Sequence, residues 1–191
     1  MNWKQQLVML MTLTLCATSP AAKSFDLAKS ESLVKFTATG TPGGFKINGT
    51  SEQKAGVISG KVSEDGGNLT ITSTFSLAQL DTGIGLRTSH MKDNYLEVGK
   101  FPNATLTIAK INATEAKTGN PTKFEGNLEL HGQKKPITGT IRFLDLSEKL
   151  SLQAEFSVTI TDFGIPVPSF AGVSVNTTIP VTVEVKDAAI L

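Results

Sequence analysis

The sequence predicts an all-β protein, an antiparallel β-barrel of about eight strands with a short helix inserted between two of them. Three observations support this fold class. From about residue 24 onward, apolar and polar residues alternate with a period of two; turn-forming residues separate the alternating runs; and one segment breaks the alternation in a helix-compatible way. Period-two alternation turns successive side chains to opposite faces, so each strand buries only one face.

The alternating runs follow one another along the chain and are rich in Val, Ile, Thr and Phe. In the run 68–75, Leu69, Ile71 and Phe75 share a face with Ser73. Four later runs show the same pattern. The apolar face of run 123–130 holds Phe124, Leu128 and Leu130, and that of run 136–145 holds Ile137, Ile141 and Phe143. Run 149–160 has an apolar residue at every second position from Leu150 to Ile160, and run 178–186 has Ile179, Val181, Val183 and Val185. These are the patterns of half-buried antiparallel strands.

Hairpin-length turns connect the runs at residues 64–68, 118–121, 131–136 and 145–149, each containing Gly, Asn, Asp or Pro. No internal repeat and no long linker divides residues 22–191, which predicts a single domain. Both a two-sheet sandwich and a closed barrel suit a meander that buries one face. The barrel is favoured because small inward residues (Gly126, Gly139, Ala154) leave room inside it, although small residues also relieve crowding at barrel corners.

Two segments interrupt the alternation. Residues 88–99 lose the period of two, and SHMKDNYLEV (residues 89–98) is their best helical candidate. Residues 165–172, IPVPSFAG, carry two prolines and a glycine and predict a second irregular segment.

The N-terminus is predicted to be a secretory signal peptide, residues 1–21. Lys4 precedes an apolar stretch from Leu7 to Ala17, and small residues at positions 19 and 21 fit cleavage before Ala22. An uncut membrane anchor and acylation of Cys16 are alternatives, the second weakened by the bulky Leu15. The expected location is the periplasm or the exterior of the cell.

Cleavage would remove the only cysteine and the only tryptophan, together with Lys4. A mature chain of about 170 residues can then be stabilised by core burial without a disulfide. Its formal charge falls from +1 to about zero, which excludes the strong basic field of a nucleic-acid-binding protein. The sequence allows transient membrane contact and homo-oligomerisation but specifies neither.

The sequence lacks the common catalytic motifs: HExxH, GxSxG, a P-loop and GxGxxG do not occur. With only His90 and His131, a histidine-rich metal site is not expected. His131 precedes Gly132 in a hairpin turn, where fixing the turn geometry is the expected role. No catalytic residue, metal ligand or cofactor is therefore predicted.

Three stretches resemble one family. GIGLRTSHMKDNYLEVGKFPNATLTI (83–108), GNLELHGQKKPIT (126–138) and SVTITDFGIPVPS (157–169) resemble, in order, the central signature, the histidine hairpin and the closing strands of YceI-like proteins. FTATGTPGGFKINGT (36–50) is similar to their first hairpin more loosely. The resemblance spans about residues 24–187. Thr88 and Lys92 depart from the family pattern, and the spacing between the histidine and the proline of the hairpin is one residue shorter than in a common form of the family signature.

This resemblance implies a lipocalin-like extended barrel with a long apolar cavity, and secreted or periplasmic binding of polyisoprenoids, isoprenoid quinones or similar amphiphiles. The departures bear on headgroup specificity more than on fold. The expected function is non-enzymatic binding of such a lipid. The alternatives are an enzyme or redox accessory acting on a quinone-like amphiphile, and a ligand-free structural domain.

The candidate ligand-binding aromatic residues lie on apolar strand faces: Phe36, Phe75, Phe143 and Phe156. As a set they suit a dry cavity for an acyl or prenyl tail, because a tail needs apolar area rather than polar partners. Plain core packing accounts for each of them taken singly.

The remaining candidates lie in the irregular segment. Arg87, His90 and Lys92 are placed to meet a phosphate or quinone oxygen at the barrel mouth, or to form a hydrogen-bond network that pins the segment to the barrel. Tyr95 and Phe101 are expected to form the lid of a pocket.

Overall fold

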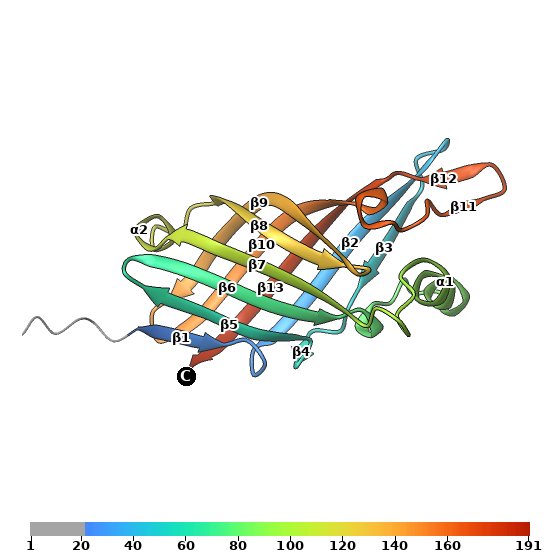
Figure 1. Ribbon diagram of the computed structural model, residues 1–191. Coiled ribbons are helices and arrows are strands. Elements are labelled where there is room, and N and C mark those ends of the chain that lie inside the picture. The colour runs from blue at the N-terminus through green and yellow to red at the C-terminus, as the bar shows by residue number, and fades with distance from the viewer. Residues whose placement is uncertain (1–21) are drawn as a thin grey trace, which may run out of the picture.

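The computed structural model describes residues 22–191 and is all-β, as predicted (Figure 1). The predicted signal peptide, residues 1–21, lies outside the described residues. The strands are β1 (Lys23–Asp26), β2 (Glu31–Thr41), β3 (Lys46–Thr50), β4 (Lys54–Ala55), β5 (Ile58–Asp65), β6 (Asn68–Ser76), β7 (Asn103–Asn112), β8 (Thr122–Leu130), β9 (Gln133–Leu146), β10 (Lys149–Thr159), β11 (Ser169–Phe170), β12 (Val173–Val175) and β13 (Thr178–Ile190).

The sheet closes on itself. Strands β5 to β10 pair with their sequence neighbours, β10 pairs with β13, and β13 returns to both β1 and β2. Phe25 lies opposite Ile190, and Phe36 opposite Val181. β1 and β2 therefore occupy one position in a closed ring of eight, which confirms the predicted antiparallel barrel and excludes the two-sheet sandwich.

A buried polar turn bends the chain between β1 and β2. The Ser30 hydroxyl donates to the Leu27 carbonyl at 2.7 Å and lies 2.8 Å from the Ser32 hydroxyl, with both serines fully buried. The Leu27 amide donates to the Gly60 carbonyl at 3.0 Å. These bonds satisfy polar groups that would otherwise be costly to bury, so the strand can change direction inside the wall.

Short helices lie at the two ends of the barrel: η1 (Leu77–Gln79), α1 (Gly85–His90), the π-helical turn η2 (Met91–Tyr95), α2 (Ala113–Ala116) and η3 (Ile160–Phe163). The predicted helix at 89–98 is present, but it begins at Gly85 and continues as η2. The sequence did not predict α2, which Asn112 caps by accepting hydrogen bonds from the amides of Thr114 and Glu115 at 2.8 and 3.2 Å.

The second irregular segment holds a small hairpin that the sequence did not predict. Ser169 and Phe170 of β11 pair with Ser174 and Val173 of β12. Its turn uses Ala171 and Gly172, both at positive φ (49° and 79°). β12 and β13 are separated by residues 176–177, where the Asn176 amide donates to the Thr39 carbonyl at 2.8 Å.

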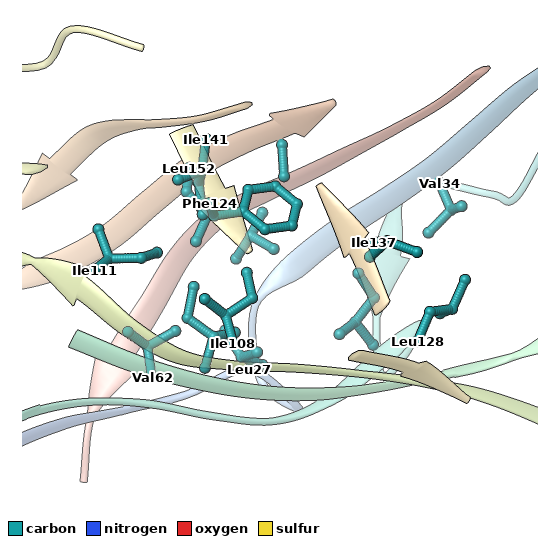
Figure 2. Packing of buried hydrophobic residues seen from close by; sticks show 14 of the residues in the cluster. Leu27, Val34, Val62, Ile108, Ile111, Phe124, Leu128, Ile137, Ile141 and Leu152 are labelled. Carbon is teal, nitrogen blue, oxygen red and sulfur yellow. The ribbon is translucent and has the colours of Figure 1, made fainter. Parts of the chain in front are cut away.

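Buried side chains fill one end of the barrel. This is the end where α2, β1 and the C-terminus lie in Figure 1. Figure 2 shows Phe124 beside Leu152 and Ile141, with Ile111, Ile108 and Val62 from β7 and β5 in the same cluster. The fully buried residues at this end include Phe25, Val62, Leu69, Ala116, Leu150 and Ala188. We call this set, with Ile111, Phe124 and Phe143, the plug.

The inward glycines Gly126 and Gly139 leave no open space beside them. A Cβ on Gly139 would lie 2.4 Å from the Glu155 carbonyl oxygen and 2.7 Å from the Phe124 ring. A Cβ on Gly126 would lie 2.8 Å from the Thr107 carbonyl oxygen. For Gly126 and Gly139, the packing therefore supports relief of crowding rather than open space inside the barrel.

Candidate functional site

The other half of the barrel encloses a cavity of about 760 Å³, within the range of small-molecule sites. It runs from Leu27, Ile108 and Ile141 beside the plug to the end of the barrel where α1 and the β11–β12 hairpin lie (Figure 1). Nearly every lining residue within the described chain is apolar; the polar ones are Ser73, Thr82, Arg87, His90, Tyr95 and Ser169.

The cavity follows from the sizes of the inward residues. β13 contributes Val181, Val183 and Val185, whereas the plug is built around the rings of Phe25, Phe124 and Phe143. Ala38, Ala104 and Ala154 also line the cavity. Because a barrel of eight strands is just wide enough for inward side chains, the small valine and alanine side chains in this lining leave space for a tunnel.

Three of the four predicted strand phenylalanines, Phe36, Phe75 and Phe156, line the cavity. The Phe36 ring covers Gly49 on the neighbouring strand, where an added Cβ would lie 2.0 Å from it. Phe156 meets Phe124 edge to face, with ring centroids 6.4 Å apart, and so marks the boundary between cavity and plug.

The other two predicted phenylalanines do not line the cavity. Phe143 is only 3% exposed and belongs to the plug, because its position on β9 lies toward the filled end. Phe101 packs on the His131 ring, with centroids 4.5 Å apart, and against Gly132. It holds the irregular segment to the β8–β9 turn from outside the cavity.

The structure adds lining residues that were not predicted. Phe45 lies at the mouth, 47% exposed, with its ring over Gly40. Met91 and Leu96 line the cavity from η2 and the residue after it. Arg87, Met91 and Tyr95 are spaced four residues apart, a one-face helical pattern that the sequence contained.

The segment 83–101 forms a lid across part of the mouth, and from it Arg87, His90 and Tyr95 line the cavity. Lys92 does not: its ammonium donates to the Ala78 carbonyl at 2.7 Å. Ile84 and Leu86, 55% and 69% exposed, also line the cavity at its mouth, so an apolar rim continues the lining to the surface.

Arg87 is the only lysine or arginine among the lining residues, and no Asp or Glu of the described chain joins it there. Its guanidinium donates through NH2 to the Thr82 carbonyl. Its Nε is buried without a hydrogen-bond partner, the one such side-chain atom within residues 22–191. Leaving a buried donor unpaired costs on the order of 1–3 kcal/mol, and more for a charged group.

Polar contacts hold both ends of the lid. At the start, the Thr88 hydroxyl donates to Asp81 at 2.9 Å and accepts from the Thr82 amide at 3.0 Å. The hydrogen bonds from the Gly83 amide and from Thr88 hold the pKa of Asp81 below its usual value.

At the far end of the lid, His131 joins three segments. Its Nε2 lies 2.8 Å from a Glu97 carboxylate oxygen, and its Nδ1 lies 3.1 Å from the Phe163 carbonyl oxygen. The His131 side chain is 10% exposed and does not line the cavity, while its backbone (φ 51°) forms the turn with Gly132. It thus ties the lid and η3 to the β8–β9 turn, beyond the turn-forming role predicted for it.

This arrangement is suited to enclosing an apolar chain with few polar contacts. Within residues 22–191, no three His, Cys, Asp or Glu side chains gather as a metal site. None of the helices in the described part of the chain has the length and apolar character needed to cross a bilayer.

Comparison with known proteins places the chain in a family. The model of the YceI-like domain matches residues 25–186. Protein YceI from Salmonella arizonae and from Salmonella newport are each 29% identical over 102 residues, which cover 50% of this chain and 51% of theirs. The chain thus matches about half the length of these curated relatives.

Two solved structures share the fold. A polyisoprenoid-binding domain from Saccharophagus degradans, implicated in plant cell wall breakdown, has a TM-score of 0.64 at 19% identity, over 88% of this chain and 98% of that one. Burkholderia cenocepacia BcnA has a TM-score of 0.65 at 16% identity, over 84% and 98%. With the domain match across most of the barrel, the chain belongs to the YceI-like family.

Proposed function

We propose that this protein is a non-enzymatic carrier or buffer of a long-chain isoprenoid, an isoprenoid quinone or a similar amphiphilic lipid. The observation that carries the proposal is the 760 Å³ cavity, which is lined almost entirely by apolar side chains and reaches the barrel end. Each methylene moved from water into such a cavity contributes about 0.8 kcal/mol, so a long tail supplies affinity without polar contacts.

The family relationship supports this reading. The related domain from Saccharophagus degradans is described as polyisoprenoid-binding, and its fold matches this barrel over most of the chain. A single tail entering past Phe45 and Leu86 at the mouth would run between Phe36 and Phe75 and end at the plug beside Phe156. The ligand's head would then lie near the lid.

We place the protein in the periplasm or outside the cell, on the strength of the predicted signal peptide. Sequencing the N-terminus of the exported protein should give Ala22 as the first residue. Loss of Trp3 with the leader would also abolish tryptophan fluorescence, since the sequence has no other tryptophan. Retained fluorescence in the exported protein would contradict cleavage.

Transient membrane contact stays a prediction. The apolar rim at the mouth, which includes Phe45, Ile84 and Leu86, is where such contact would let a tail pass from a bilayer into the barrel. Passage through water would expose the whole tail and would be slow for that reason.

Native mass spectrometry tests the main proposal. Protein exported by its own host should carry an apolar adduct, and delipidated protein should bind an added polyprenyl alcohol with one-to-one stoichiometry. Thermal unfolding should shift upward with ligand, because binding to the folded state alone stabilises it. A ligand-free spectrum together with no binding of polyprenyl alcohols or isoprenoid quinones would refute the proposal.

A further inference from the structure

The incompletely paired guanidinium of Arg87 points to a specific group in the ligand. Buried polar atoms in native proteins nearly always have a partner, and an exception needs a physical explanation. Within residues 22–191, Arg87 Nε is the one buried side-chain nitrogen or oxygen without a partner. Arg87 also lines the cavity near the mouth, where an enclosed ligand can approach its guanidinium.

The protein holds this guanidinium in place from one side. Its NH2 group donates to the Thr82 carbonyl, and Thr82 is 5% exposed. The Thr82 hydroxyl in turn lies 2.9 Å from the Thr88 hydroxyl, which donates to Asp81. Arg87 is therefore oriented before a ligand arrives, which lowers the entropic cost of forming a further hydrogen bond.

No acidic side chain neutralises Arg87. Among the described residues, none of the ion pairs includes it. The nearby Asp81 accepts from the Gly83 amide at 2.7 Å and from Thr88 at 2.9 Å. The guanidinium charge is thus available to an oxygen atom of the ligand.

We propose that Arg87 is the specificity-determining residue of the site and selects amphiphiles whose head is a neutral or singly charged oxygen acceptor, such as a carboxylate or a carbonyl. This inference rests on the proposed lipid-binding function and adds the class of head. The tail fills the apolar tunnel, and the head oxygen accepts a charge-assisted hydrogen bond from the Arg87 guanidinium.

The charge of the lining argues against a diphosphate head. Arg87 is the sole lysine or arginine lining the cavity, and the ammonium of Lys92 is held outside by the Ala78 carbonyl. A diphosphate carries several negative charges, and partly burying them beside one cation leaves most of them uncompensated. A single carboxylate or carbonyl matches one guanidinium.

The test uses four probes with the same C20 prenyl tail: geranylgeranoic acid, geranylgeraniol, the matching hydrocarbon and geranylgeranyl diphosphate. Each is titrated into delipidated protein by displacement of a fluorescent lipid. Wild type should bind the acid about tenfold or more tightly than the hydrocarbon, since a hydrogen bond to a charged group contributes roughly that factor or more. The diphosphate should bind more weakly than the acid.

Arg87→Met keeps an unbranched apolar chain and removes the donor. It should abolish the preference for the acid while leaving hydrocarbon affinity within about twofold, which also shows that the cavity is intact. Arg87→Lys, which keeps the charge without the fork, should retain part of the preference. Lys92→Met is the matched control on the same segment and should keep the whole preference.

The outcomes separate this inference from the proposed function. If the hydrocarbon binds but wild type shows no preference for the acid, or Arg87→Met retains it, Arg87 does not select the head and lipid binding stands. Tightest binding of the diphosphate overturns the head class. If no probe binds, the proposed function fails and this inference fails with it.

Discussion

Replacing Ala154 with phenylalanine should shorten the lipid that the barrel holds. Ala154 is 4% exposed and lines the cavity, opposite Val183 on one side and Ile141 on the other, and both of these also line it. A phenyl group there adds about six carbons to space that the tail would occupy. At about 0.8 kcal/mol per methylene, displacing about six methylenes removes roughly 5 kcal/mol from the binding of a tail that fills the cavity.

The assay is a series of linear alcohols of increasing length, titrated into delipidated protein. In wild type, each methylene should raise the affinity about fourfold, from 0.8 kcal/mol per group, until the tail reaches the plug. In Ala154→Phe the affinity should rise with the same slope, but it should stop rising at alcohols about six carbons shorter. Short alcohols should bind both proteins equally.

Glu155→Phe is the matched control, since Glu155 is the next residue of β10 and is exposed on the outer face. It should leave the length limit unchanged. Val183→Phe, across the strand pair, adds its ring to the same part of the cavity and should reproduce the shortening if Ala154→Phe is poorly folded. An unchanged length limit in well-folded Ala154→Phe and Val183→Phe would refute the tunnel as the tail site.

Three further predictions test the plug, the lid and the rim. Gly139→Ala should lower the free energy of unfolding by about 1–3 kcal/mol in urea, because its Cβ would meet the Glu155 backbone oxygen at 2.4 Å; Gly85→Ala in α1, with open space around its Cβ, should be neutral or slightly stabilising. Equal stability of the two variants would contradict the packing described for the plug. The folded-state pKa of Asp81 is lowered, so its contribution to holding the lid is present at neutral pH and is lost as the pH falls below about 4 and through that pKa. The NMR shift of the Gly83 amide should report this titration below the usual aspartate range, and a midpoint at or above that range would be inconsistent with the hydrogen bonds seen. Leu86→Ser should slow the transfer of a polyprenyl alcohol from vesicles several-fold while leaving equilibrium affinity within a few-fold, because Leu86 is 69% exposed at the mouth; unchanged transfer rates would argue against contact through the rim.

The strands and their buried faces could be predicted because side-chain direction in a strand depends only on position along the chain. Leu69, Ile71, Leu150, Leu152 and the valines of β13 all face inward as their spacing indicated. The short hairpin turns could be predicted for the same reason, because a few adjacent residues, such as Gly132 and its neighbours, form the whole turn. α2 was missed because its four residues rest on a single capping side chain, Asn112.

The candidate site was predictable only as a set of inward or irregular residues. Phe36 and Phe143 have the same local pattern, yet Phe36 lines the cavity and Phe143 fills the plug. Their difference depends on where β2 and β9 lie along the barrel, which the pairing registers decide. Arg87 and Lys92 lie on one segment, but only the fold turns Arg87 toward the cavity and gives Lys92 the Ala78 carbonyl.

The alternation of apolar residues thus accounts for the strands and their inward faces, since these follow from interactions between near neighbours in the chain. It suits a sandwich as well as a barrel, and the pairing of β13 with β1 and β2 decides for the barrel. Strand stagger and closure between β1 and β13 decide which inward positions meet one another. A small inward residue can then leave cavity space, as Ala154 does, or make room for a neighbouring ring, as Gly139 does for Phe124. The cavity and the plug arise from contacts between residues far apart in sequence, so they exist only once the barrel has closed.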